Sequence, residues 1–185
     1  EPADATAAGV YASLLSTLDA AFGSREVSGR HVVISGLGQV GGRLATKLAA
    51  AGARLSVTDV NLAKKDFAAS LGAAWVDVAE AHTLEADLFV PCGLGGVLTP
   101  RVIDELRVPS VVGAANNQLA QHEGAAQLAA RGILWAPDFV VNAGGVIYLD
   151  MATRPNADFA AIEARVSTIG DTITTIFADA RPKGI

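Results

Sequence analysis

The stretch HVVISGLGQVG at residues 31–41 decides the fold of this chain. A short apolar strand runs into the pattern G-x-G-x-x-G at Gly36, Gly38 and Gly41, and a helical pattern follows at once. Gly36 allows a tight turn, Gly38 lets a phosphate approach the backbone, and Gly41 lets the helix pack close to the strand. Because a helix N-terminus offers free N–H groups and a partial positive charge, the stretch predicts a site for a dinucleotide pyrophosphate.

A second apolar run, residues 55–58, ends at Asp59, twenty-three residues after Gly36. In a dinucleotide-binding βαβ unit, an acid at this place accepts hydrogen bonds from the adenosine ribose, although an Asp after a strand also serves as a turn or helix cap. Its negative charge would repel a 2′-phosphate, and no arginine lies in the next few positions. The sequence therefore predicts NAD rather than NADP as the cofactor.

Composition narrows the class of protein. The chain has 185 residues, of which 51% are apolar and 18% charged, so it is expected to fold. A net charge of −5 without any basic run argues against nucleic acid and anionic membranes as partners. One cysteine permits no internal disulfide, and neither a signal peptide nor a membrane span is visible, so a cytoplasmic location is expected. The three histidines lack metal-ligand spacing, and no metal site is expected.

Alternating short strands and helices predict an α/β fold, with a doubly wound, mostly parallel sheet of the Rossmann type and flanking helices. We expect a single dinucleotide-binding domain over residues 1–185, with a leading helix at 1–23, a core at 30–147 and a long C-terminal helix at 157–180. The apolar stripe of the last helix either closes the domain's own core or docks on something outside this chain.

Capping residues and glycines set the expected boundaries of the elements. Asp4 is expected to cap the leading helix, and Asn61 the helix that ends near Gly72. Thr99 and Pro100 are expected at the start of another helix. The expected strands are residues 31–35, 54–58, 73–76, 86–92, 110–112 and 133–136, and the expected helices between them follow Gly41 to about Ala51, Asn61 to Gly72, Thr99 to Leu106 and Leu119 to Arg131.

In a parallel sheet, ligands bind beyond the carboxyl ends of the strands. Glycine-rich and polar sequence collects where five of the expected strands end. These places are residues 36–41, Asp59, residues 92–96, residues 113–117 and residues 138–145. The sequence therefore predicts the binding site at this edge of the sheet.

Three asparagines lie in these loops. Asn116 and Asn117 follow a buried strand, and their amides suit ribose hydroxyls or a carboxamide, unless they only form a left-handed turn. Asn142 precedes Ala-Gly-Gly, where the backbone can lie against a ring, and is predicted beside the nicotinamide, with a turn or cap as the alternative. Asp138 either holds a loop or meets substrate.

Other reactive residue types give little sign of catalysis. A lone Cys92 at the end of an apolar strand is typical of a small buried side chain rather than a nucleophile. Trp75 and Trp135 fall on expected strands and are predicted to lie in the core.

Lysine is informative through its positions. Chemistry at an amine carbon usually needs a lysine desolvated enough to lose its proton. The chain has four, Lys47, Lys64, Lys65 and Lys183, and none stands in an apolar, glycine-lined context. No catalytic residue is therefore expected in this chain.

Several motifs in series resemble one family. They are GLGQVG at 36–41, TDVN at 58–61, PCGLGG at 91–96, GAANNQL at 113–119 and APDFVVNAGGVI at 136–147. Together they resemble the cofactor domain of the amino acid dehydrogenases of the leucine, phenylalanine and valine type, relatives of glutamate dehydrogenase. The resemblance runs from about Thr6 to the last helix. It implies oxidative deamination of an L-amino acid to a 2-oxo acid and ammonia, with hydride transfer to NAD.

The resemblance also implies roles for matching positions. The pyrophosphate would lie on Gly36, Gly38, Gln39, Val40 and Gly41. Asp59 with Asn61 would hold the adenosine ribose, and the Cys92–Gly93 backbone with Asn116 would line the nicotinamide ribose. Asn142 would face both nicotinamide and substrate, and Thr6 matches a threonine near the carboxamide.

One departure from the family is large. Its members carry an N-terminal substrate domain with the catalytic lysine, and no such segment is present here. Because the first residue is Glu1 rather than Met, we expect a piece of a longer, homo-oligomeric enzyme that binds NAD but does not turn over an amino acid. The alternatives are a stand-alone NAD-binding or regulatory module and a hydroxy acid dehydrogenase. The latter needs a catalytic histidine with an acid partner, for which the three histidines are poorly placed.

Overall fold

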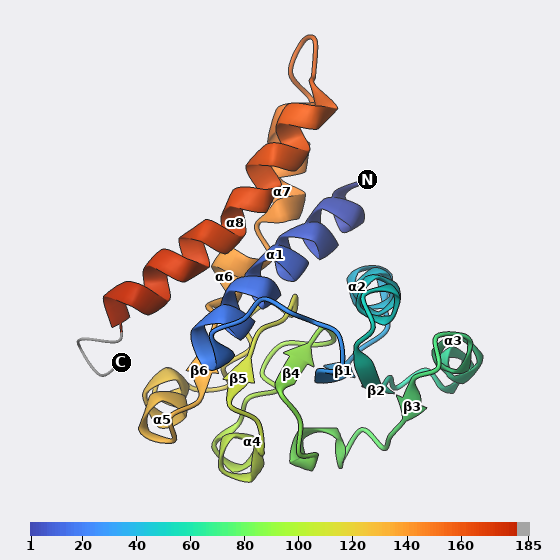
Figure 1. The fold of residues 1–185 in the computed structure, drawn as a ribbon, viewed down its shortest axis with the longest axis vertical. Coiled ribbons are helices and arrows are strands. Elements are labelled where there is room, and N and C mark those ends of the chain that lie inside the picture. The colour runs from blue at the N-terminus through green and yellow to red at the C-terminus, as the bar shows by residue number, and fades with distance from the viewer. Residues whose placement is uncertain (181–185) are drawn as a thin grey trace.

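The computed structural model, which describes residues 1–180, contains one sheet of six parallel strands in the order β3-β2-β1-β4-β5-β6 (Figure 1). The strands are β1 (His31–Ser35), β2 (Arg54–Thr58), β3 (Ala74–Trp75), β4 (Leu88–Pro91), β5 (Ser110–Val111) and β6 (Leu134–Trp135). The strand order reverses direction between β1 and β4, which is the switch point where doubly wound folds bind ligands. The predicted fold class is confirmed.

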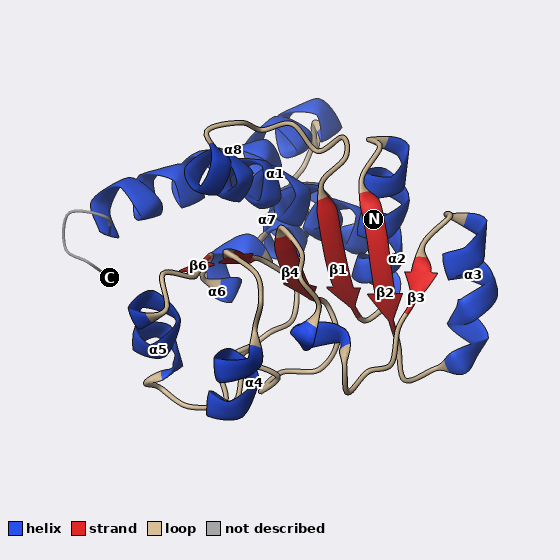
Figure 2. Ribbon diagram, turned by 60° about the horizontal axis from the view of Figure 1, so that its bottom comes forward, coloured by secondary structure: helices blue, strands red, loops and turns tan. Residues whose placement is uncertain are grey.

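Helices cover both faces of the sheet (Figure 2). They are α1 (Pro2–Phe22), α2 (Gln39–Ala50), α3 (Lys65–Ser70), α4 (Pro100–Glu105), α5 (Gly124–Ala130), α6 (Asp138–Val141), α7 (Gly144–Ala152) and α8 (Phe159–Ala180), with 3-10 turns η1 (Leu62–Lys64) and η2 (Ala81–Thr83). α1, α2 and α8 contribute to one apolar cluster, and α4 and α5 to another on the opposite face. Among residues 1–180, no helix is long and apolar enough to span a membrane.

The central strands are apolar throughout because both of their faces are buried. Successive side chains of a strand point to opposite faces, so Val32 and Ile34 of β1 join the cluster beneath α1 and α2, whereas Val33 joins the one beneath α4 and α5. All three are fully buried. The sheet thus separates two apolar cores and contributes side chains to both.

The long C-terminal helix packs on the leading helix. Leu14 of α1 and Ile173 of α8 are fully buried in the same cluster, and the Ser16 hydroxyl donates to the Gly170 carbonyl at 2.8 Å. Phe177 is buried on this face, whereas Phe159, the first residue of α8, is 59% exposed. Of the two alternatives, the first is confirmed: α8 closes the core of this chain.

Three local predictions need correction. The helix expected from Leu119 begins only at Gly124, because Leu119 forms a bridge with Leu98. α1 starts at Pro2 with Glu1 as its cap, and Asp4 instead forms an ion pair with Arg43 of α2. α2 begins at Gln39, so Gly41 lies inside the helix rather than before it. In addition, α6 and α7 were not predicted at all.

Candidate functional site

The glycine turn after β1 is closely packed at Gly36 and Gly41 and open at Gly38. Gly36 has φ +108°, and a Cβ there would lie 2.6 Å from the Gly93 nitrogen. A Cβ on Gly41 would lie 2.0 Å from the Gly36 carbonyl oxygen, so α2 sits directly on the turn. Around Gly38, by contrast, no atom lies within 4 Å of an added Cβ. Only the Gly38 side of the turn therefore leaves space for a ligand.

The N-terminus of α2 faces this turn with unpaired donors. Its first intrahelical bond runs from Gly42 N–H to the Gly38 carbonyl at 2.9 Å, and no side chain caps the helix. The N–H groups of Gln39, Val40 and Gly41 consequently have no acceptor within the helix. Such donors, together with the helix dipole, suit an anion such as a diphosphate.

Asp59, at the end of β2, binds back to the same turn. Its Oδ2 accepts the Leu37 N–H at 2.6 Å, and its Oδ1 accepts the Asn61 N–H at 2.8 Å. Asn61 in turn caps η1 by accepting the Ala63 N–H at 3.1 Å. Both residues therefore have a structural role, but each oxygen of a carboxylate has a second lone pair that remains for a ligand hydroxyl.

A cleft of about 470 Å³ lies between these loops, beyond the carboxyl ends of β1, β2 and β4. Three of its lining residues, Val60, Val78 and Leu94, are exposed large apolar side chains, with 84%, 48% and 89% of their surface accessible. The other lining residues are Ser35, Gly36, Gly38, Thr58, Asp59, Pro91, Cys92, Gly93, Gly95 and Val97. The cleft thus combines an apolar rim with the glycine turn and one carboxylate.

Cys92 lines the cleft and packs against α2. A Cβ on Gly41 would lie 2.9 Å from the Cys92 Cβ, so the side chain packs against α2. Burial raises the pKa of the Cys92 thiol to about 11, although a backbone hydrogen bond from Ala114 opposes the shift. A thiol that stays protonated is a poor nucleophile, so the half-buried Cys92 side chain favours the expected packing role over a nucleophilic one.

The loops after β5 and β6 meet through two asparagines. The Asn142 Nδ2 donates to the Asn116 Oδ1 at 2.6 Å, although 26 positions separate them along the chain. Asn117 adopts φ +52°, so it forms the left-handed turn that was one of its two predicted roles. The amides of Asn116 and Asn142 thus form one polar surface at the predicted edge of the sheet.

Asp138 and Gln118 hold these loops. Asp138 is 8% exposed, and its Oδ2 accepts the Asn117 N–H at 2.6 Å, which favours its loop-holding alternative. Gln118 is fully buried; its Nε2 donates to the Gly113 carbonyl at 2.9 Å, and its Oε1 accepts the Trp135 Nε1–H at 3.1 Å. Gln118 was not among the predicted site residues, since its only signal in the sequence is a polar residue directly after two turn asparagines.

Thr6 lies against the other end of the Asn142 loop. A Cβ on Gly145 would lie 2.6 Å from the Thr6 hydroxyl, and one on Gly144 would lie 2.2 Å from the Ala5 carbonyl. The Thr6 hydroxyl itself donates to the Pro2 carbonyl at 2.9 Å within α1. The two glycines therefore let the start of α1 approach the predicted nicotinamide side.

Two of the three histidines, His31 and His82, make contacts within the fold. His31 is buried, with Nδ1 beside the Glu85 carbonyl at 2.9 Å and Nε2 beside the Ser56 hydroxyl at 2.8 Å. His82 contacts Glu105 at 2.7 Å, and this contact is the main cause of a lowered pKa at Glu105. Within residues 1–180, no three side chains of the metal-binding types cluster together.

The described lysines lie outside the cleft. Lys47 of α2 places its ammonium 4.7 Å from the centre of the Tyr11 ring, and Lys65 lies over Trp75 at 5.6 Å. Lys64 lines a separate hollow of about 410 Å³ beside Gly38 and Arg43. Lys183 lies outside the described residues.

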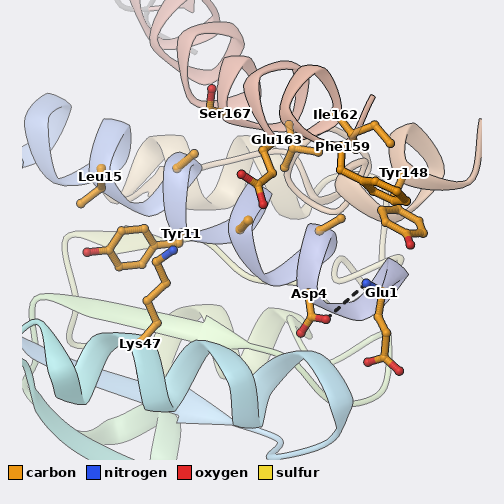
Figure 3. Close-up of a pocket in the computed structure, with 14 residues that line it drawn as sticks. Glu1, Asp4, Tyr11, Leu15, Lys47, Tyr148, Phe159, Ile162, Glu163 and Ser167 are labelled. Carbon is orange, nitrogen blue, oxygen red and sulfur yellow. Dashed lines mark ion pairs between the residues drawn. The ribbon is translucent and has the colours of Figure 1, made fainter. Parts of the chain in front are cut away.

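A larger groove of about 670 Å³ lies among α1, α2, α7 and α8 (Figure 3). Tyr11, Tyr148 and Phe159 line it together with acidic side chains that include Glu163. No strand end contributes to this groove, so it is separate from the cleft at the switch point.

The strand order and the glycine turn together define the class of doubly wound, Rossmann-type α/β proteins. Within this class, residues 56–180 match the family model described as Glutamate/Leucine/Phenylalanine/Valine dehydrogenase. The chain belongs to this family, as the resemblance in the sequence indicated.

Individual relatives agree with the family assignment. The chain is 37% identical to phenylalanine dehydrogenase from Bacillus thermotolerans, over 97% of this chain and 48% of the relative. It is also 37% identical to leucine dehydrogenase from Thermoactinomyces intermedius, over 100% of this chain and 50% of the relative. The crystal structure of L-tryptophan dehydrogenase from Nostoc punctiforme superposes with a TM-score of 0.94 at 35% identity, over 100% of this chain and 56% of that one. The chain thus spans about half the length of the relatives it matches.

Proposed function

We propose that this chain is the NAD-binding half of an L-amino acid dehydrogenase. The main support is one arrangement: an open Gly38, unpaired amides at the start of α2, and the Asp59 carboxylate on the same turn. These groups offer donors to a diphosphate and acceptors to a neighbouring sugar. Relatives named as dehydrogenases of phenylalanine, leucine and tryptophan match over nearly the whole chain, which supports the reaction class.

The apolar rim of the cleft supports a purine in the adenosine half. Val60 and Leu94 follow β2 and β4 and are both largely exposed at the cleft. Exposed apolar side chains at a concave site are typical of ligand contact, and a flat base would cover them. The adenine would therefore lie at this rim, with its ribose toward Asp59 and Asn61.

The fixed carboxylate of Asp59 supports NAD over NADP. Two backbone N–H groups hold it at the end of β2, so it cannot turn away without losing both bonds. A 2′-phosphate on the adenosine ribose would bring like charges together. Among the described residues, no lysine or arginine lines the cleft, and Lys64 and Arg43 line the separate hollow beside Gly38.

The nicotinamide half would lie toward the paired amides. The Cys92–Gly93 backbone and Asn116 would contact the nicotinamide ribose, and Asn142 with Thr6 would lie near the carboxamide and the substrate. When bound, NAD supplies the acceptor for a hydride from the α-carbon of the amino acid. The chain's own residues would orient that ring with amide hydrogen bonds.

This half would bind NAD without deaminating an amino acid. Deamination needs a general base, and none of Lys47, Lys64 and Lys65 lines the cleft. The base, the pocket for the amino acid side chain and the contacts of a homo-oligomer would belong to the remaining half of the enzyme. Residues 1–185 would then serve as one cofactor-binding domain.

The role of Asp59 is tested by Asp59→Ala. We expect NAD binding to weaken by about 1–3 kcal/mol, because ribose hydroxyls lose a charged acceptor. Isothermal titration calorimetry with NAD and NADP measures this loss, and the preference for NAD over NADP should fall with it. An unchanged NAD affinity would leave Asp59 with its structural role alone.

A matched control is Asp158→Ala. Asp158 also accepts two backbone N–H groups, from Ala160 and Ala161 at the start of α8, but it lies outside the cleft. Both substitutions should lower the stability of the chain, whereas only Asp59→Ala should change the affinity for NAD.

A further inference from the structure

Asp138 is a buried carboxylate with a single described partner. It is 8% exposed, and within residues 1–180 its carboxylate accepts one hydrogen bond, from the Asn117 N–H at 2.6 Å. Its Oδ1 is not among the buried polar atoms of residues 1–180 that lack a partner, so the bond to Oδ2 is the contact through which this carboxylate acts on the protein. The donor it does have belongs to the loop that carries Asn116.

The backbone that Asp138 holds is in the left-handed region, which asparagine enters more readily than other non-glycine residues. Asn117 has φ +52°, in the left-handed region that non-glycine residues enter at a cost. The charge-assisted bond from its N–H to Asp138 stabilises this conformation. Loss of the bond would free Asn117 to leave the left-handed region and would move its neighbour Asn116 with it.

Asp138 also begins the element that presents Asn142. It is the first residue of α6, and its carbonyl accepts the Asn142 N–H at 2.9 Å. One residue thus fixes the backbone on both sides of the bond from Asn142 to Asn116, through its side chain on one side and its main chain on the other. The rest of the loop is held independently of Asp138: Gln118 donates to the Gly113 carbonyl at 2.9 Å, and the Asn117 carbonyl accepts the Gly96 N–H at 2.7 Å.

We propose that Asp138 is a positioning residue that sets the Asn116–Asn142 pair for the nicotinamide half of the dinucleotide. This inference rests on the proposed function, since it needs a nicotinamide to lie at that pair. It assigns no contact between Asp138 and the ligand. The acceptor oxygen of Asp138 acts through the Asn117 backbone, and the adenosine half of the cleft is independent of it.

Two substitutions separate the acceptor from the charge. Asp138→Asn retains an acceptor oxygen for Asn117, and its NH2 group would take the place of Oδ1, which has no protein donor within residues 1–180. Asp138→Ala removes the acceptor altogether. Binding of NAD and of ADP to this chain is then measured by calorimetry, because ADP keeps the adenosine and the diphosphate but lacks the nicotinamide nucleoside.

Asp138→Ala should weaken NAD binding about tenfold, the size of one lost buried hydrogen bond, and ADP binding less than about twofold. Asp138→Asn should keep the NAD affinity within about threefold of the wild type, because the acceptor remains. The matched control is Asp87→Ala. Asp87 accepts the His31 N–H at 2.7 Å at the start of β1, away from the cleft, so its loss should leave the ratio of the two affinities unchanged.

Equal weakening of NAD and ADP by Asp138→Ala, or no weakening of either, would overturn the positioning role while leaving the proposed function standing. If the wild type bound neither ligand, the proposed function would fail, and the positioning role with it. If Asp138→Ala does not fold, hydrogen exchange of the Asn117 amide in the wild type tests the positioning role instead. Slow exchange of the Asn117 amide, slowed further by NAD but not by ADP, would support the positioning role. Exchange as fast as in an open loop would contradict it.

Discussion

At the scale of single residues, carboxylates shape the candidate site through the backbone. Asp59 accepts the N–H of Leu37 in the glycine turn, and Asp138 accepts the N–H of Asn117 in the amide loop, each at 2.6 Å. Such charge-assisted bonds are stronger than neutral ones and fix loops that no helix or strand supports. The residues proposed to serve the ligand therefore also determine the shape of the edge where it would bind.

His31 gives a prediction on pH. Burial lowers its pKa below the ordinary value of 6.5, and the charge of Arg54 lowers it further. The unfolded chain therefore binds a proton more readily than the folded one, and His31 contributes stability that is present above pH 6.5 and lost as the pH falls below it. Urea unfolding should give a smaller free energy of unfolding at pH 5.5 than at pH 7.5.

His31→Gln supplies the control for this prediction, because its amide retains polar groups for the Ser56 hydroxyl and the Glu85 carbonyl but does not titrate. The change in stability between the two pH values should be smaller in this variant. A dependence on pH as steep as in the wild type would assign the effect to other groups.

The sequence could predict which residues lie at the candidate site, but not which groups they form hydrogen bonds with. Positions after strands predicted Asn116 and Asn142 at one edge, but the hydrogen bond between them depends on how two distant loops fold. Asp138 had two open roles because a lone acid in a loop gives no sign of its donor. Gln118 was missed because burial of an amide follows from packing around Trp135, not from a local pattern.

At the scale of elements, the packing of the glycine turn predicts different effects for substitutions at Gly38 and Gly41. Gly38→Ala should fold with stability within about 1 kcal/mol of the wild type, because φ there is −70° and no atom lies within 4 Å of the new Cβ. It should nevertheless weaken NAD at least about tenfold, because the Cβ would occupy the space proposed for the diphosphate. Calorimetry and urea unfolding measure the two effects.

Gly41→Ala, unlike Gly38→Ala, should lower the stability of the chain. Its Cβ would lie 2.0 Å from the Gly36 carbonyl, and such overpacking costs about 1–3 kcal/mol or more in stability. Gly42→Ala, where the nearest atom would lie 3.5 Å away, is the control and should change neither quantity. A Gly38→Ala variant that binds NAD as the wild type does would contradict the proposed place of the diphosphate.

Elements with a strong local pattern were predicted well. β1 and β2 have the expected bounds because continuous apolar runs between turns are typical of buried parallel strands. The helix expected from Leu119 was wrong, since a bridge between Leu119 and Leu98 outweighs the helical pattern there. The sequence of α7 begins with two glycines and is apolar on nearly every side, so it has no helical periodicity to reveal it.

At the scale of the whole molecule, α1 and α8 complete the core over one face of the sheet (Figure 1). Ile173 of α8 is fully buried there, so Ile173→Ala should lower the free energy of unfolding by about 2–5 kcal/mol. Thr175→Ala, on the exposed face of α8, should change it by less than about 0.5 kcal/mol. Urea unfolding followed by circular dichroism measures both.

A loss below about 1 kcal/mol for Ile173→Ala would mean that α8 contributes little to the fold. The expected large loss would instead show that the leading and final helices fold together with the sheet, although neither belongs to the minimal nucleotide-binding unit. The same two helices also form the walls of the groove in Figure 3, away from the cleft.

The central claim is that the edge of the sheet beyond β1, β2 and β4 binds NAD. Calorimetric titration of this chain with NAD and NADP tests it most directly. We predict one NAD bound per chain, and NADP weaker by at least about tenfold because of the fixed charge of Asp59. No binding of either dinucleotide, or tighter binding of NADP, would contradict the claim.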